Sequence, residues 1–343
     1  MIAAIAKEIS ITEKINAEEI ETIYLGGGTP SLLDEKDLAL LFEAIRQKFP
    51  VKEDAEVTLE ANPDDINRKI LSDWKRAGIN RLSVGLQSFN EEELRWMNRA
   101  HDAAQSLQCL DDIAAAGFEN FSVDLIYGSP LQTDEDLRKN FEIIAKRHVP
   151  HISCYALTVE PGTALNKLIK EHKSPATDPG KQSAQFHLLL DLMGAAGYEQ
   201  YEISNFSKPG YRSRHNSSYW QGKTYYGFGP AAHSFDGNSK RKWNISNNSL
   251  YIQSLEKNTI PFEEEILTDE QRLNEYIMSS LRTAERLNLN HAKNNFGEKE
   301  MVRVENKAER YLQSGKMIKS DDHLVLTKEG KFFADGIAAD LFS

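Results

Sequence analysis

The stretch ETIYLGGGTPSLLDEKDL, residues 21–38, joins an apolar run, three consecutive glycines and an acidic segment with helical spacing. Gly26, Gly27 and Gly28 leave backbone N–H and C=O groups open to close approach, and the Thr-Pro-Ser that follows is typical of a helix start, which favours anions. The stretch therefore predicts a strand, a turn and a helix, with the turn either facing a ligand or purely structural. A P-loop would need a lysine after the glycines, and a dinucleotide fingerprint needs wider glycine spacing.

The same order of strand, polar edge and helix recurs along the chain. Near-continuous apolar, β-branched runs favour parallel strands that are covered on both faces. They occupy residues 22–30, 56–63, 81–89, 121–130 and 152–162. Segments with helical spacing separate them, and Gly78 and Gly117 lie where two of these helices should end. The pattern predicts an α/β fold, either an open doubly wound sheet or a complete or partial TIM-type barrel.

The rhythm of the chain changes near residue 198. Residues 198–267 are rich in aromatic, glycine and polar residues, whereas residues 268–343 read as a helix followed by helix, strand, Asp-Asp turn, strand and helix. That ending is typical of a winged-helix-like module. We therefore expect three parts, namely a domain at 1–197, a connecting region at 198–267 and a C-terminal domain at 268–343.

Composition excludes several classes of partner. The 343 residues carry a formal net charge of −11, so no broad positive field exists to attract nucleic acid or an anionic membrane. No apolar run is long enough to span a membrane, and residues 1–19 carry charges that no signal-peptide core would hold. We expect a cytoplasmic protein. Cys109 and Cys154 fall in separate predicted elements, which favours two buried thiols without a disulfide.

Several polar side chains occur at predicted strand ends and connections. Glu60 ends the second strand, Asp124 stands between Val and Leu, and Gln87 and Arg99 belong to the third strand and the segment after it. Any one of them is more often a satisfied structural group. Because the carboxyl ends of parallel strands share one edge of a sheet, the four together indicate a polar ligand there.

A second cluster lies in the stretch RHNSSYW, residues 214–220. His215 could bind a metal, and Tyr219 and Trp220 could stack on a flat macrocycle. The alternative is a packed loop between domains.

The motifs YLGGGTPS, LEANP, GLQSFN, RAH, GFENFSVDLIYGSPLQT, ALTVEPGT, HNSSYW and GFGPAAHS follow one another in this order. Together they resemble the radical S-adenosylmethionine (SAM) family of oxygen-independent coproporphyrinogen III oxidases, most closely its heme chaperone branch, HemW, which the HNxxYW pattern favours. The resemblance implies a partial (β/α)6 TIM-type radical SAM barrel that holds SAM and a 4Fe-4S cluster. A smaller α+β, winged-helix-like C-terminal domain would follow it.

The resemblance also implies roles for single residues. His215 becomes a candidate heme contact. The SAM contacts would be Gly27, Gly28, Thr29, Glu60, Gln87, Arg99, Asp124 and Thr158.

One departure from the family pattern concerns the cluster. The family's first strand is followed by CxxxCxxC, and this chain holds no such motif. We expect the first strand and the cysteine loop to be missing from this polypeptide, through an artificial start or, as a less favoured alternative, a real cluster-free form. An unpaired sheet edge argues for the first explanation. The chain as given should not cleave SAM reductively.

The leading hypothesis is a HemW-like chaperone that binds heme and passes it to an unidentified recipient protein, with SAM and the cluster bound only in an intact form. A second hypothesis is an oxygen-independent coproporphyrinogen III oxidase, which decarboxylates propionate side chains in porphyrin biosynthesis. A third is a non-catalytic barrel with a relic SAM site. Whether the chain is an enzyme stays open.

Overall fold

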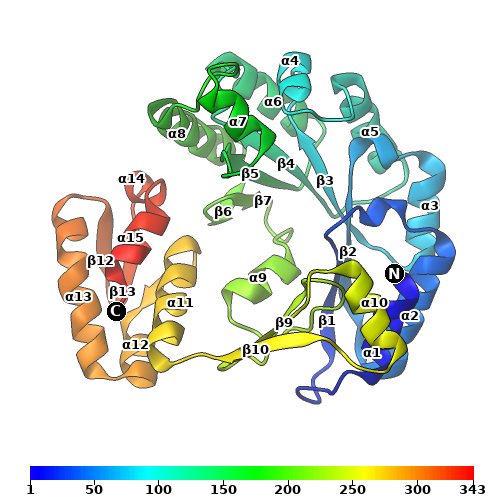
Figure 1. Ribbon diagram of the computed structural model, residues 1–343. Helices are drawn as coiled ribbons and strands as arrows, with labels where there is room; N and C mark the ends of the chain where they lie inside the picture. The colour runs from blue at the N-terminus through cyan, green and yellow to red at the C-terminus, as the bar shows by residue number, and fades with distance from the viewer. The chain divides into compact units, whose positions relative to one another are not determined.

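The computed structural model describes residues 1–343, and these form two compact units (Figure 1). One unit comprises residues 1–24, 33–56 and 213–343. The other comprises residues 25–32 and 57–212. The predicted division at residues 197 and 267 stays a prediction.

The largest sheet has seven strands in the order β1-β2-β3-β4-β5-β7-β6. The pairs β2–β3, β3–β4 and β4–β5 are parallel, whereas β7 is antiparallel to both β5 and β6. This confirms the α/β fold with a partial-barrel sheet. The bounds are β1 (Ile20–Leu25), β2 (Val51–Ala61), β3 (Arg81–Gln87), β4 (Phe121–Tyr127), β5 (His151–Ala156), β6 (Glu199–Glu202) and β7 (Asn205–Ser207).

The strands from β3 to β5 are apolar on one face and polar on the other. In β3, Leu82, Val84 and Leu86 are fully buried and alternate with Arg81 and Ser83. Successive side chains of a strand point to opposite faces, so the apolar residues share one face of the sheet. The other face is also buried at the start of these strands, where Arg81, Ser122 and His151 are 2%, 3% and 0% exposed, so burial on both faces agrees with the prediction there.

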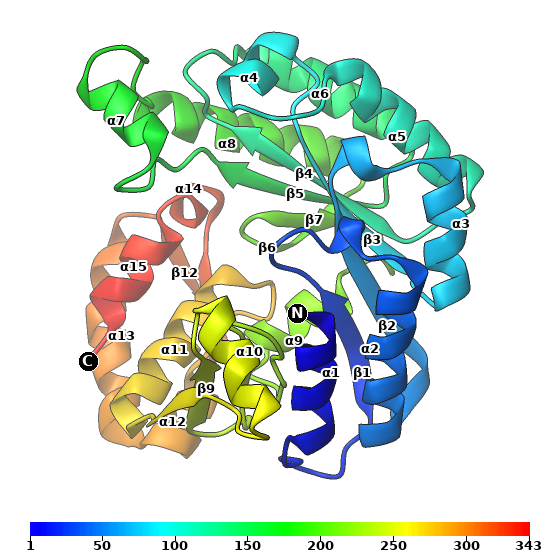
Figure 2. The same ribbon diagram turned by 45° about the vertical axis from the view of Figure 1, so that its right-hand side comes forward.

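Helices cover that apolar face, as Figures 1 and 2 show. Each of the six helices of this unit leads into its turn through a residue with positive φ, namely Gly78 (φ 101°), Asn98 (φ 55°), Gly117 (φ 72°), His148 (φ 53°), His172 (φ 56°) and Gly197 (φ 73°). The two predicted glycine stops are thus confirmed. The helices of this unit are α3 (Arg68–Ala77), α4 (Glu91–Trp96), α5 (Ala103–Ala115), α6 (Asp134–Lys146), α7 (Ala164–Lys170) and α8 (Pro179–Ala195).

The other unit collects segments that are distant in sequence. Glu8, on the N-terminal helix, is buried and accepts hydrogen bonds from the Gly229 N–H, the Asn244 amide and the Tyr251 hydroxyl. Burial raises the pKa of this carboxyl. The elements are α1 (Ile2–Ile11), α2 (Glu35–Lys48), α9 (Arg214–Trp220), α10 (Asn248–Glu256) and a sheet of β10 (Phe262–Ile266), β9 (Lys240–Asn244) and β8 (His233–Phe235).

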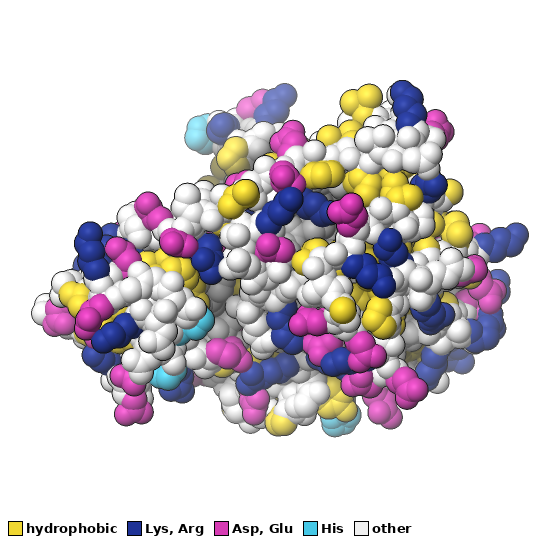
Figure 3. Space-filling model, turned by 90° about the horizontal axis from the view of Figure 1, so that it is seen from below, with side chains coloured by type: hydrophobic (Ala, Val, Ile, Leu, Met, Phe, Trp, Pro, Cys, Tyr) yellow, Lys and Arg dark blue, Asp and Glu magenta, His cyan; other side chains and the backbone are white.

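The chain ends in a module with winged-helix order, which confirms the predicted ending. Its hairpin turns at Asp321, whose φ is 51°. The elements are α11 (Asp269–Arg282), β11 (Leu287–Asn288), α12 (Leu289–Phe296), α13 (Glu298–Gln313), β12 (Met317–Ser320), β13 (His323–Leu326), α14 (Lys328–Lys331) and α15 (Ala334–Leu341). Apolar helices of the length that a bilayer crossing demands do not occur in the structure. On the face drawn in Figure 3, basic and acidic side chains are interspersed.

Candidate functional site

The glycine turn after β1 is a side-chain-free surface. Gly27 and Gly28 have φ of 72° and 55°, and a Cβ added to either would meet no atom within 4 Å. The Gly27 N–H donates to Glu60 Oε2 at 3.2 Å, which joins the turn to the second strand. Thr29 is exposed, and its carbonyl accepts the Leu32 N–H to start a short helical turn. The turn therefore offers open backbone beside a carboxylate.

The charged residues predicted for this edge lie within electrostatic reach of one another. Burial raises the pKa of Asp124 to about 6, and the Glu60 carboxylate adds to this effect. A hydrogen bond from Ser153 and the positive charges of Arg81 and Arg99 act in the opposite direction. A half-buried carboxyl group that shares its surroundings with a second carboxylate and a guanidinium is typical of a polar ligand site.

Arg99 is held over the end of β3. Its Nη2 donates to the Gly85 carbonyl at 3.2 Å and lies 3.4 Å from Asn62 Oδ1, while its Nε is buried without a hydrogen-bond partner. A Cβ on Gly85 would lie 3.0 Å from Gln87 Nε2 and 3.4 Å from Arg99 Nη2. Gly85 thus leaves room for the two polar side chains side by side. The open glycine backbone, the carboxylates and the guanidinium fit a small zwitterionic ligand such as SAM.

Two further residues near this edge are Thr158 and His101. Thr158 is exposed and its hydroxyl contacts only the Ala156 carbonyl, at 3.4 Å, so the structure does not bring it to the other predicted residues. His101 is buried. Its Nε2 donates to the Leu86 carbonyl at 3.0 Å, and its Nδ1 has no hydrogen-bond partner. In the sequence, only its place in the RAH motif, two residues after Arg99, pointed to this position.

His215 lies on α9, in the other unit, within an aromatic cluster. Its ring stacks on Tyr24 with 4.7 Å between centroids, and it meets the edge of Tyr219 at 4.9 Å. Tyr219 in turn contacts Tyr225 at 4.7 Å. The Nδ1 of His215 is 2.8 Å from Thr22 Oγ1, and its Nε2 is 3.1 Å from the Tyr219 hydroxyl. Both ring nitrogens are therefore engaged.

The N-terminus of α9 is fixed by a buried carboxylate. Glu56 accepts the Arg214 N–H at 3.1 Å and the His215 N–H at 3.0 Å, one with each oxygen, and is 4% exposed. Ser213 Oγ accepts the Asn216 N–H. Because negative charge is stabilising at a helix N-terminus, this arrangement sets the position of His215.

Electrostatics leave His215 as a neutral imidazole. Burial lowers its pKa to about 4, so the ring carries no charge at neutral pH. The tautomer that donates from Nδ1 to Thr22 leaves a lone pair on Nε2, which accepts the Tyr219 O–H. A neutral imidazole with a lone pair on Nε2 fits a heme iron, provided that the exposed Tyr219 side chain moves aside.

The thiols do not fit a 4Fe-4S cluster. Cys109 and Cys154 lie in α5 and β5, and both are buried and free. Burial raises the pKa of Cys109 to about 12 and also raises that of Cys154. No group of three or more His, Cys, Asp and Glu side chains is placed to hold a metal ion. The residues of this chain therefore do not supply the thiolates that such a cluster needs.

Comparisons with known proteins agree with this geometry. Residues 4–144 match the Radical SAM superfamily, and residues 267–333 match the HemN C-terminal domain. The chain is 34% identical over 331 residues to the "Heme chaperone HemW" of Mycobacterium tuberculosis, covering 96% of this chain and 82% of that protein. It is 33% identical over 279 residues to the Bacillus subtilis protein of the same description, covering 80% and 73%.

Among solved structures, the coproporphyrinogen III oxidase HemN from Escherichia coli is similar with a TM-score of 0.82 and 21% identity. The match covers 100% of this chain and 82% of that chain. At this identity the likeness shows the fold alone.

Proposed function

Since the chain belongs to the HemW family of the radical SAM superfamily, we propose that it is a heme chaperone, which binds heme and passes it to an acceptor protein. The relatives named above are described as heme chaperones, and the HNxxYW motif at residues 215–220 is the sequence feature that this proposal depends on. A cytoplasmic place of action is part of the same proposal.

The observation that supports heme binding most directly is the state of His215. Its imidazole is neutral, stacked on Tyr24, and separated from solvent on one side by the partly exposed ring of Tyr219. Movement of Tyr219 would present Nε2 to an iron atom, and the surrounding aromatic rings would contact the macrocycle. The Thr22 hydroxyl would hold the opposite ring nitrogen and so fix the orientation of the imidazole.

We further propose that Gly27, Gly28, Thr29, Glu60, Gln87, Arg99 and Asp124 form the SAM site, with Thr158 approaching only when ligand is bound. SAM would bring a sulfonium-activated adenosyl group to this edge of the sheet. Glu60 would hold its ammonium group and Arg99 its carboxylate, while the glycine turn admits the methionine backbone closely. SAM would bind here without an iron-sulfur cluster, because the residues of this chain do not supply the ligands of one.

Titration of the chain with hemin, followed by the Soret band, tests the heme proposal. The wild type should give a saturable, shifted band, and His215→Ala should change the band position and weaken binding about tenfold, the loss expected for one axial bond. His233→Ala is the matched control, because His233 is an exposed histidine of the same unit that stacks on Trp243 at 5.9 Å. Equal spectra for the two variants would reject His215 as the heme contact.

A further inference from the structure

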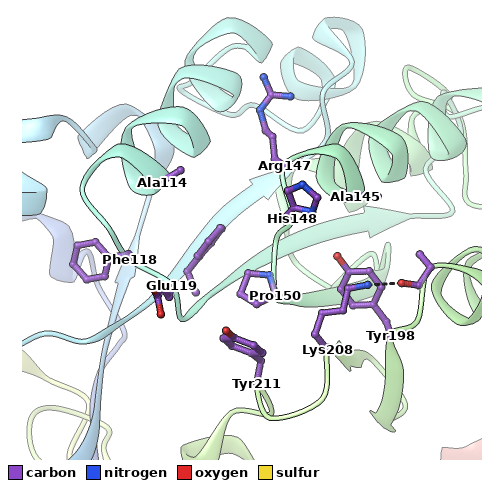
Figure 4. A pocket seen from close by; sticks show the side chains of 12 residues that line it. Ala114, Phe118, Glu119, Ala145, Arg147, His148, Pro150, Tyr198, Lys208 and Tyr211 are labelled. Carbon is purple, nitrogen blue, oxygen red and sulfur yellow. Dashed lines mark hydrogen bonds between the residues drawn. The ribbon is translucent and has the colours of Figure 1, made fainter.

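A pocket of about 420 Å³ opens at the amino ends of β4 and β5 (Figure 4). It lies between the start of β4 at Phe121, Pro150 before β5 and Lys208 after β7. The predicted SAM residues Glu60 and Gln87 belong to the opposite ends of the strands of this unit. The volume is in the range of about 300 to 1,000 Å³ that small-molecule sites occupy. This pocket is therefore a separate candidate site.

The walls of the pocket are largely apolar and aromatic. Phe118, Phe121, Pro150, Tyr198 and Tyr211 line it, and Figure 4 shows several of their rings around a common space. Such walls favour a flat or compact apolar group over a strongly hydrated one.

One side of the pocket carries a positive charge. Lys208 Nζ donates to the Ala196 carbonyl and lies 4.2 Å from the centre of the Tyr198 ring. An ammonium group has three donors, so a ligand can still receive one from Lys208. Arg147 also lines the pocket, but its Nε pairs with Asp111 at 3.0 Å and its side chain points away from the walls in Figure 4. In that view the carboxylate of Glu119 lies on the side away from Lys208.

His148, in the turn after α6, brings a polar side chain to the pocket. Helices α3, α5 and α8 enter their turns through glycines with positive φ, whereas α4, α6 and α7 do so through Asn98, His148 and His172, with φ of 55°, 53° and 56°. The exposed side chain of His148 lines the pocket. Its imidazole therefore places a hydrogen-bond donor at the edge of the pocket.

From these observations we propose that the pocket binds a small carboxylic acid that bears an aromatic or alicyclic ring. The ring would lie among Phe121, Pro150 and Tyr211, and the carboxylate would face Lys208 and His148. This inference is independent of heme and SAM binding, because none of its residues belongs to either proposed site.

Benzoate is a suitable probe, with benzamide as its neutral analogue and benzylamine as its cationic one. Chemical-shift perturbation in the full chain should show saturable binding of benzoate, localised to the pocket. Binding of benzamide should be about tenfold weaker, since a charge-assisted hydrogen bond is lost, and benzylamine should not bind. Absence of saturable benzoate binding, or equal binding of the three compounds, would overturn the proposal.

Variants test the assignment of side chains. His148→Gly should keep or raise the melting temperature while weakening benzoate binding several-fold, so a loss of binding cannot be attributed to unfolding. Lys208→Met should weaken binding about tenfold, whereas Glu119→Gln should tighten it about twofold because a repulsive charge is removed.

Lys75→Met is the matched control for the lysine variant. Lys75 Nζ contacts the Ala116 and Gly117 carbonyls at 3.0 Å and lies 5.5 Å from the centre of the Phe118 ring, but it does not line the pocket. The Lys75→Met variant should bind benzoate with the affinity of the wild type. Equal losses in the two lysine variants, or wild-type binding by His148→Gly, would refute the assigned side chains.

Discussion

Replacing Glu56 with alanine removes both acceptors at the N-terminus of α9. The two hydrogen bonds, from the Arg214 and His215 N–H groups, are charge-assisted and buried. Hydrogen bonds to charged groups contribute about 1.5 to 3 kcal/mol each, and the lower figure applies here because some of the helix end can recover contact with water. We therefore expect Glu56→Ala to lower the free energy of unfolding by about 3 kcal/mol.

Urea denaturation at neutral pH, followed by far-UV circular dichroism, measures this loss. The stability of Glu56→Gln should fall between those of the wild type and Glu56→Ala. The glutamine amide keeps one oxygen that can accept an N–H, but its NH2 group is a donor and meets the second N–H without forming a hydrogen bond. Glu53→Ala is the control, because Glu53 is an exposed carboxylate of the same strand and its loss should change stability by less than about 0.5 kcal/mol.

A Glu56→Ala protein as stable as Glu53→Ala would refute the reasoning. The same variant should also bind hemin more weakly, because His215 loses its fixed position. If stability falls but the Soret titration is unchanged, α9 is structural and does not contact heme.

Three further predictions concern the two sites. Burial raises the pKa of Asp124 to about 6, so this group stabilises the folded state fully below its ordinary value near 3.8 and the contribution is lost as the pH rises through 6. Asp124→Asn should therefore be about 1 to 2 kcal/mol more stable than wild type at pH 7 in urea denaturation, with a smaller difference at pH 5. Gly27→Ala should lower the free energy of unfolding by about 1 kcal/mol, because the space around Gly27 is open and only its positive φ disfavours alanine. Calorimetry should show weaker SAM binding by this variant. Tyr219→Phe removes the hydroxyl that occupies Nε2 of His215, so hemin affinity should rise about threefold in the Soret titration; unchanged affinity would mean that this hydroxyl does not compete with heme for Nε2.

The local elements could be predicted from sequence because their signals are local. The five β-branched runs predicted five strands, and each overlaps one of the observed strands β1 to β5. Gly78 and Gly117 marked turns that need positive φ. The insertion of β7 between β5 and β6 could not be predicted, since three residues carry little periodicity and their place depends on pairing with His151 to Ser153.

The candidate sites were only partly predictable, because their contacts join residues that are distant in the chain. His215 was found through its motif, but the residues that define its chemistry, Thr22, Tyr24 and Glu56, are more than 150 positions away in the chain. The burial of His101 could not be predicted, because a histidine in a segment between helices is usually a surface residue and only the fold brings it to the Leu86 carbonyl.

The division of one unit into residues 1–24, 33–56 and 213–343 has a consequence for synthesis on the ribosome. Translation delivers the partners of Glu8 and Glu56 last, so residues 1–24 and 33–56 must wait while residues 57–212 emerge and fold together with residues 25–32. During that interval the apolar side of α1 lacks its later cover from α10. Nascent chains stalled before residue 213 should therefore engage chaperones through the N-terminal segment and release them once α9 and α10 have left the exit tunnel.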